Sequence, residues 1–283
     1  MRVAVIGLGR MGFPMAKHIA AAGHELIVND AVQEALDRAT GEGLTVGSVE
    51  AMADREVVCT SLPNTPHVRA VYTERGAVFD AVPPGTVCVD FSTISVSGSR
   101  EIAAAGRKKG ISFLDAPVSG TSIHVEDATA VVMVGGDGEA LDKARPVIET
   151  FASRVEHVGP NGAGLDLKLI TNRLLTTHLA AIAGAIVELE KIGLDVEQCI
   201  EIIKSGAVPK LLDYKAEALI NRDFTPLFTV DLMRKDLSIA AEALPHSDLG
   251  DLSRTLLEQA HEIGLGEADV AAIIKVIEAQ ASR

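Results

Sequence analysis

Two polar residues, Lys168 and Asn172, stand out in a largely apolar stretch that runs from Gly159 to Gly193. Lys168 and Asn172 are four residues apart, so on a helix they share one face. A lysine within an apolar helix is costly unless it is paired or used. The pattern indicates a functional lysine. Its alternative is a lysine whose head reaches solvent or an ion-pair partner near the start of the helix.

A glycine-rich motif follows the first strand-like run, residues 2–6. The motif consists of Gly7, Leu8, Gly9, Arg10, Met11 and Gly12. Its first glycine permits a tight turn, its second lets the backbone approach a pyrophosphate, and its third lets helix and strand pack closely. A strand precedes the motif, a helix-like segment follows, and a second strand ends in an acid, which is the context that a dinucleotide-binding loop requires. We therefore expect these six residues to bind a dinucleotide at a helix N-terminus.

Asp30 ends the second expected strand, where an acid would bind the ribose 2′-hydroxyl of the cofactor. A carboxylate at this place would repel a 2′-phosphate, so the sequence favours NAD over NADP. Asn29 and Arg10 leave NADP open, because the arginine could meet a phosphate. The plain alternative is a structural glycine turn followed by a surface aspartate.

The elements that must position these residues alternate at first and then become helical. Strands are expected at 56–63, 86–93, 111–120, 128–137 and 153–159, with helices between them and a loop over 121–127. Beyond the apolar stretch, helical spacing continues over 195–206, 208–221, 229–244, 248–263 and 266–281. The order predicts an α/β Rossmann-type dinucleotide-binding domain, residues 1–161, followed by an all-α domain, residues 162–283. The second domain begins with a long interdomain helix, which we expect to be buried on most sides.

Polar and loop residues follow two of the expected strands. Ligands of such sheets bind beyond the carboxyl ends of the strands. Leu62 and Pro63 after one strand, and Ser92 and Thr93 after another, fall where a nicotinamide and its ribose could lie. As isolated hydroxyl residues, Ser92 and Thr93 could instead be helix caps.

The composition excludes several classes of protein. With 47% hydrophobic residues in 283, the chain can form a large core and is not disordered. A net charge of −13, no Trp and only two Tyr argue against a nucleic-acid partner. Three widely spaced cysteines fit reduced thiols rather than disulfides or a zinc site, and the histidines show no ligand spacing, so we expect no metal. We expect no signal peptide, no membrane association and a cytoplasmic protein.

Separated motifs together resemble the β-hydroxyacid dehydrogenase family, which includes 3-hydroxyisobutyrate dehydrogenase and tartronate semialdehyde reductase. The matching segments are GLGRMGFPMA (7–16), VDFSTIS (89–95), DAPVSG (115–120), GLDLKLITN (164–172) and DLMRKDLSIA (231–240).

The resemblance implies roles for individual residues. Lys168 matches the catalytic lysine of the family, and Asn172 matches the asparagine that helps to position the substrate. Ser119 and Gly120 match the loop that holds the substrate carboxylate. Thr93 and Lys235 match cofactor contacts. The neighbouring Asp236 would support the lysine, or act as a structural cap or ion-pair partner. Taken without the resemblance, Lys235 could be a solvated charge on a helix.

The sequence also departs from the family pattern. Thr121, which we include among the substrate-binding residues, stands where the family commonly has another glycine. The segment after it lacks the expected small residues and contains His124, a candidate substrate contact or an ordinary loop residue. Thr171 stands where many members have a second asparagine. These departures leave the substrate beyond its carboxylate open.

The resemblance predicts an NAD-dependent dehydrogenase of a small 3-hydroxy acid. Two alternatives stay open, an NADPH-dependent reductase of glyoxylate, succinate semialdehyde or tartronate semialdehyde, and a catalytically idle dinucleotide-binding scaffold. The apolar helical half offers more hydrophobic surface than one protomer can bury, so we expect a homo-oligomer, a dimer or tetramer.

Overall fold

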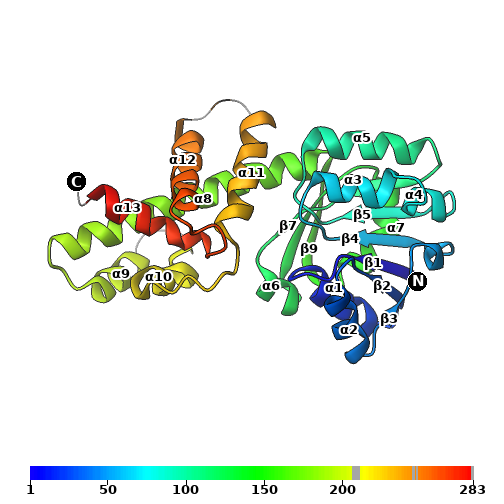
Figure 1. Ribbon diagram of the computed structural model, residues 1–283, viewed down its shortest axis with the longest axis horizontal. Coiled ribbons are helices and arrows are strands. Elements are labelled where there is room, and N and C mark those ends of the chain that lie inside the picture. The colour runs from blue at the N-terminus through cyan, green and yellow to red at the C-terminus, as the bar shows by residue number, and fades with distance from the viewer. Residues whose placement is uncertain (206–210, 244–245, 247, 282–283) are drawn as a thin grey trace. The chain divides into compact units, whose positions relative to one another are not determined.

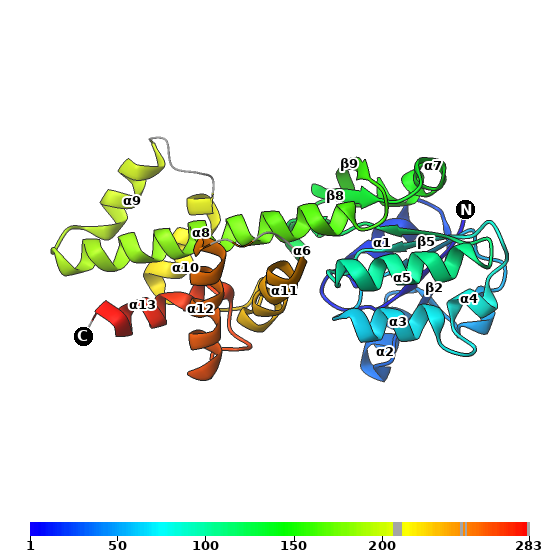
Figure 2. The same ribbon diagram turned by 90° about the horizontal axis from the view of Figure 1, so that it is seen from above.

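The computed structural model describes residues 1–205, 211–243, 246 and 248–281. The chain divides into two compact units, Met1–Lys168 and Leu169–Arg283 (Figures 1 and 2). The predicted fold class is confirmed, because a largely parallel sheet with flanking helices is followed by a helical unit. The boundary between residues 161 and 162 stays a prediction.

The sheet of the first unit has the strand order β3-β2-β1-β4-β5-β6-β8-β7, with β9 beside β8. Strands β1 to β6 pair in parallel, whereas β8 runs antiparallel to β6 and β7. Chain order reverses between the neighbours β1 and β4, which is the place where sheets of this kind bind ligands. The strands are β1 Arg2–Ile6, β2 Glu25–Asn29, β3 Thr45–Val46, β4 Val57–Thr60, β5 Val87–Asp90, β6 Ser112–Asp115, β7 Val118–Ser119, β8 Ala130–Gly135 and β9 Ala152–Gly159.

Helices cover both faces of this sheet. In Figure 1, α3 and α5 lie on one face and α1 and α2 on the other. Apolar side chains of α1 and α7 enter one core cluster with those of the central strands. The helical elements are α1 Gly12–Ala21, α2 Gln33–Gly41, η1 Glu50–Met52, α3 Thr65–Thr73, α4 Val78–Ala81, α5 Val96–Arg107, α6 Ser122–Glu126 and α7 Gly138–Ile148.

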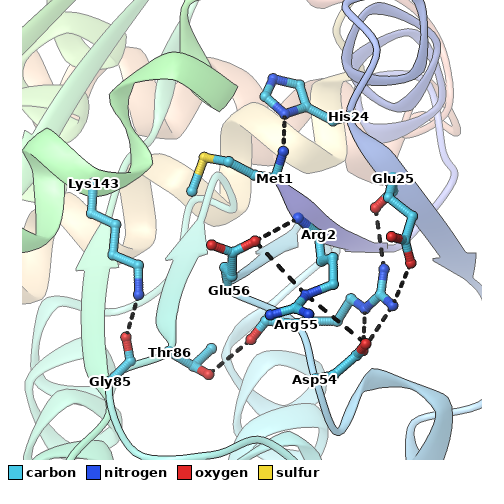
Figure 3. A network of polar contacts seen from close by, with 10 residues as sticks. All are labelled: Met1, Arg2, His24, Glu25, Asp54, Arg55, Glu56, Gly85, Thr86 and Lys143. Atoms are coloured by element: carbon cyan, nitrogen blue, oxygen red, sulfur yellow. Dashed lines mark hydrogen bonds and ion pairs between the residues drawn. The ribbon is translucent and has the colours of Figure 1, made fainter.

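A network of charges holds the edge of the sheet where the parallel strands begin (Figure 3). The guanidinium of Arg55 is buried and forms ion pairs with Asp54 at 2.7 Å and Glu25 at 2.9 Å. Thr86 donates a hydrogen bond to the carbonyl of Arg55, which ties in the start of β5. This network stabilises the edge opposite to the one that carries the glycine motif.

The long helix α8 (Ala163–Lys191) begins in the first unit and continues into the second. The second unit packs its helices around an apolar cluster that includes Leu179, Ile186 and Leu257. A buried ion pair of 2.6 Å between Lys215 and Asp269 lies in the same unit. The further elements are α9 Val196–Lys204, α10 Leu211–Asn221, α11 Val230–Ala243, α12 Asp248–Glu262, η2 Val270–Ala272 and α13 Ile273–Ala281.

Several expectations about the elements are wrong. The single strand expected over 111–120 is two strands, because Pro117 has no N–H for a ladder and the chain moves at this point from pairing with β5 to pairing with β8. Helix α8 is not buried on most sides, since the side chains of Ile170 and Leu174 are 49% and 57% exposed. The helix expected over 266–281 starts later, with η2, whose N-cap is Asp269.

Parts of three expected helices, residues 206, 208–210 and 244, lie outside the described residues. In the described part of the chain, α8 is the one helix long and apolar enough to cross a membrane, a property that the core helix of a soluble protein can share. Cys59, Cys88 and Cys199 are unpaired thiols.

Candidate active site

The glycine motif joins the end of β1 to the start of α1. Gly7 has φ +93°, and a Cβ at this position would lie 2.3 Å from the carbonyl oxygen of Ser61. A Cβ on Gly12 would lie 1.9 Å from the carbonyl oxygen of Gly7. The expected tight turn and close helix–strand contact are therefore confirmed. Gly9 has no atom within 4 Å of the place of its Cβ, so its backbone faces open space that a ligand can approach.

The N-terminus of α1 is suited to an anion. No side chain caps it at Met11, and its first turn holds no acidic residue. Its first backbone N–H groups thus keep the partial positive charge of a helix start. Leu8 is buried and Arg10 is exposed on this loop. The cradle fits the pyrophosphate of a dinucleotide, and such a cofactor when bound would supply hydride chemistry there.

Asp30 lies directly after β2 and faces the glycine motif. Its carboxylate accepts hydrogen bonds from the N–H of Leu8 at 2.6 Å and of Val32 at 2.8 Å. The sequence did not single out Arg38 of α2, which donates to the carbonyl of Leu8 at 2.5 Å and stacks 4.0 Å above the ring of Phe13. The carboxylate thus binds the peptide group before Leu8 and the guanidinium binds the one after it, at the place expected for the adenosine ribose.

A buried hydrogen-bond network links the ends of β4 and β5. Oδ1 of Asp90 accepts hydrogen bonds from the hydroxyls of Thr60 at 2.7 Å and Ser92 at 2.5 Å. The hydroxyl of Ser92 in turn accepts the N–H of Leu62 at 2.8 Å. Burial raises the pKa of Asp90 to about 7, although these hydrogen bonds oppose the shift. The network fixes the loop that holds Leu62 and Pro63. An acid at the end of a strand is the one local pattern that points to it.

The caps of the neighbouring helices are now identified. Asn64 caps α3 by accepting the N–H of His67. The N-cap of α5 is Ser95, so the alternative that Ser92 or Thr93 caps this helix is wrong. Thr93 is half-buried between β5 and α5, at the same edge as the glycine motif.

The segment after β7 is ordered by an unexpected motif. A loop was expected over 121–127, but Thr121 and His124 form a capping box that starts α6. Nδ1 of His124 accepts the backbone N–H of Thr121 at 3.1 Å, which leaves that N–H unavailable to a substrate. Ser119 ends β7, and Gly120 follows with φ +128°. Of the three residues expected to bind the substrate, only Thr121 has its backbone N–H occupied by this capping box.

Lys168 lies in the second turn of α8, and the residue is buried, with 8% of its surface exposed. At the start of this helix, the carboxylate of Asp115 accepts the N–H groups of Gly162 and Leu165. The sequence did not assign this task to Asp115, because nothing in the local pattern connects the end of one strand with a helix that starts about fifty residues later.

Polar residues also meet within the second unit. The amide of Asn172 donates to Oδ2 of Asp236 at 2.6 Å, and the ammonium of Lys235 lies 3.0 Å from Oδ1 of the same carboxylate. Asn172 and Asp236 are buried, with Lys235 more exposed. The expectation that Asp236 supports Lys235 agrees with this ion pair.

The expected residues form two groups, one in each unit. The glycine motif, Asp30, Leu62, Pro63 and Thr93 lie at the carboxyl edge of the sheet, and Asn172 and Lys235 belong to the helical unit. Within the described ranges no cluster of three or more His, Cys, Asp or Glu could hold a metal ion.

The chain is similar to known proteins over its whole length. A family model described as the NAD binding domain of 6-phosphogluconate dehydrogenase matches residues 2–159. A second, described as NAD-binding of NADP-dependent 3-hydroxyisobutyrate dehydrogenase, matches residues 162–277.

Individual relatives agree with these matches. An NAD-dependent L-serine dehydrogenase of Pseudomonas aeruginosa is 35% identical, with 98% of each chain covered. A 3-sulfolactaldehyde reductase of Escherichia coli is 31% identical, covering 99% of this chain and 96% of the relative. The solved structure of Mycobacterium tuberculosis 3-hydroxyisobutyrate dehydrogenase with L-serine is 34% identical, with a TM-score of 0.89 and coverage of 98% and 99%. This chain therefore belongs to the β-hydroxyacid dehydrogenase family, NAD(P)-dependent oxidoreductases that act on the CH–OH group of hydroxy acids.

Proposed function

We propose that this enzyme oxidises a small 3-hydroxy acid with NAD, and that Lys168 exchanges the hydroxyl proton. The observation that carries the proposal is the burial of Lys168 in a helix that starts in the dinucleotide-binding unit. A buried ammonium is costly in a soluble core, which is the setting in which lysines serve as acids and bases. Names of relatives support the substrate class, because L-serine is itself a 3-hydroxy acid.

The proton chemistry follows from the residue type. Oxidation of an alcohol releases a hydride from carbon and a proton from oxygen, and a dinucleotide held by the glycine motif would supply the hydride acceptor. Neutral Lys168 takes the proton, and in the reverse direction its ammonium donates to the developing alkoxide. We propose that Asn172 orients the substrate, that Ser119 and Gly120 donate backbone hydrogen bonds to its carboxylate, and that Lys235 contacts the cofactor.

The preference for NAD rests on Asp30. Its carboxylate accepts the N–H of Leu8 in the glycine motif and the N–H of Val32 after β2, which together hold it beside the place proposed for the ribose. A 2′-phosphate would meet this negative charge. Arg38 and Arg10 favour NADP instead, since both lie on or beside the same loop and could meet a phosphate. The second candidate function, reduction of a semialdehyde or glyoxylate with NADPH, depends on them.

A substrate panel tests the function and the cofactor together. Turnover of L-serine, 3-hydroxyisobutyrate and other 3-hydroxy acids is followed at 340 nm with NAD and with NADP, and semialdehyde reduction is followed in reverse. We expect NAD-dependent oxidation. A higher kcat/KM with NADP would contradict the role given to Asp30, and no turnover in either direction would favour the idle scaffold.

Substitution of the lysine tests the mechanism. Lys168→Ala should lower kcat by about 10²- to 10⁴-fold while the Kd for NADH is unchanged. Lys168→Arg should be equally inactive in oxidation, because a guanidinium keeps its proton. Lys191→Ala, at the other end of α8, is the control and should turn over normally. A Lys168→Ala enzyme with near-normal kcat would exclude the proposed mechanism.

Two properties accompany the proposal. We propose that the enzyme works in the cytoplasm, as its free thiols suit a reducing compartment. We also propose that it forms a dimer or tetramer, because Ile170 and Leu174 leave an apolar strip of α8 exposed in the single chain. Light scattering of the purified protein measures the second property.

A further inference from the structure

Helix α8 begins without a cap of its own. The N–H of Asp166 donates to the carbonyl of Gly162 at 2.9 Å, which makes Gly162 the N-cap residue. Helices commonly satisfy the N–H groups of the N-cap and of the third helical residue with side chains at these two positions. Here the N-cap is a glycine and the third residue is Leu165, so neither side chain can accept a hydrogen bond.

Asp115 of strand β6 supplies both missing bonds. Its Oδ1 accepts the N–H of Gly162 at 2.7 Å, and its Oδ2 accepts the N–H of Leu165 at 3.1 Å. One carboxylate from a distant part of the chain thus replaces the two reciprocal bonds of a capping box. The residue is 1% exposed, so water cannot take over these bonds.

The packing around this carboxylate leaves little freedom. A Cβ on Gly135 of β8 would lie 2.6 Å from Oδ2 of Asp115, and a Cβ on Gly164 would lie 2.4 Å from the carbonyl of Met133. Both glycines are needed for the first turn of α8 to approach β6 and β8 this closely. The start of the helix is therefore held by two hydrogen bonds inside a contact that has no room for a methyl group.

Charge adds to this attachment. Burial raises the pKa of Asp115 to about 6, although the N–H groups of Gly162 and Leu165 oppose the shift. Above that pH the carboxylate is ionised and meets the partial positive charge of the α8 N-terminus. A neutral amide in its place would lose this attraction and would turn an N–H₂ group toward one of the two backbone N–H groups.

The attached turn leads directly to the reactive lysine. Lys168 follows Leu165 by three residues, so the two lie on neighbouring positions of one helix face. Asp115 also opens the segment to Ser119 and Gly120 on its other side. We propose that Asp115 is a positioning residue that fixes Lys168 relative to the cofactor edge of the sheet. The inference rests on the proposed role of Lys168.

Asp115→Asn tests the inference, with Asp137→Asn as the matched control. Asp137 caps α7 by accepting the N–H of Ala140 at 2.9 Å, so it is also a helix-capping carboxylate, on a helix with no proposed reactive residue. The melting temperature of each variant is measured first, and both are then assayed at 20 °C with the best acid of the substrate panel. Asp115→Asn should lower kcat by about 10- to 100-fold with an unchanged Kd for NADH, because small misplacements of a reacting group cost this much.

The outcomes are decisive in each direction. A kcat for Asp115→Asn within threefold of the Asp137→Asn value overturns the inference, and so does a parallel loss of NADH affinity, which would mean general damage to the unit. If Asp115→Asn does not fold, Gly164→Ala takes its place, since its methyl group displaces the start of α8 while the carboxylate is kept. The same loss of kcat is expected, and wild-type kcat refutes the inference.

The proposed function fails separately. Should Lys168→Ala retain turnover, the mechanism is wrong whatever Asp115→Asn does. Should Lys168→Ala be inactive while Asp115→Asn is normal, the positioning role alone is wrong.

Discussion

The buried carboxyl of Asp90 should make the stability of the dinucleotide-binding unit depend on pH. Burial raises its pKa from 3.8 to about 7 in the folded protein. The folded state thus binds this proton more tightly than the unfolded chain, so the contribution of Asp90 is complete below pH 3.8 and is lost as the pH rises through 7. Oδ2 finds no hydrogen-bond partner among the described residues, which fits a carboxyl that carries its proton there.

Asp90→Asn removes this titration and keeps the shape of the side chain. Its carbonyl oxygen can still accept the hydroxyls of Thr60 and Ser92, and any cost of the buried N–H₂ group is the same at every pH. With the two pKa values above, the contribution of Asp90 to the free energy of unfolding falls by about 2.5 kcal/mol between pH 5 and pH 8. The wild-type protein should lose that amount relative to the variant.

Tyrosine fluorescence provides the assay, since the chain has two tyrosines and no tryptophan. Tyr72 is fully buried, and its hydroxyl lies 3.0 Å from the hydroxyl of Thr60, which donates to Asp90. In a Tyr214→Phe background, Tyr72 reports urea unfolding of the dinucleotide-binding unit by itself, so the helical unit does not distort the two-state treatment.

The comparison at pH 5, 6, 7 and 8 decides the question. Asp142→Asn removes an exposed carboxyl of the same unit and controls for the loss of one charge. If the free energies of unfolding of wild type and Asp90→Asn differ by the same amount at every pH from 5 to 8, the account of this network is refuted. If the variant loses more unfolding free energy than the wild type between pH 5 and pH 8, the direction of the pKa shift given for Asp90 is wrong.

Two further substitutions separate binding from stability. Gly9→Ala should leave the free energy of unfolding unchanged, because its methyl group meets no protein atom within 4 Å. The same variant should bind NADH about tenfold or more weakly in a fluorescence titration. Normal NADH affinity would show that the cofactor does not approach this backbone. Arg55→Met should lower the free energy of unfolding by about 1–3 kcal/mol, less than for a fully buried pair because Asp54 and Glu25 are 55% and 68% exposed. Its kcat should be unchanged, since Arg55 lies at the opposite edge of the sheet, and a loss of kcat at full NADH occupancy would contradict this separation.

Local patterns in the sequence determined much of this protein. Alternating strands and helices followed by helical spacing predicted the two-part fold, because the periodicity of side chains is a property of short segments. The turn at Gly7 and the close contact at Gly12 were also readable, since each depends on a backbone that lacks a Cβ. Lys168 stood out because an ionisable residue in an apolar helix needs an explanation.

The tertiary structure decided which polar groups pair. The carboxylate of Asp115 meets Gly162, 47 residues later, only because β6, β8 and α8 converge, and sequence spacing carries no trace of that contact. The same holds for the bonds of Asp90 to Thr60, set by the register of β4 and β5. The amide of Thr121 is occupied by His124 because the segment folds as a helix rather than a loop. A hydrogen bond depends on distances of a few tenths of an ångström, and only the packed chain fixes those.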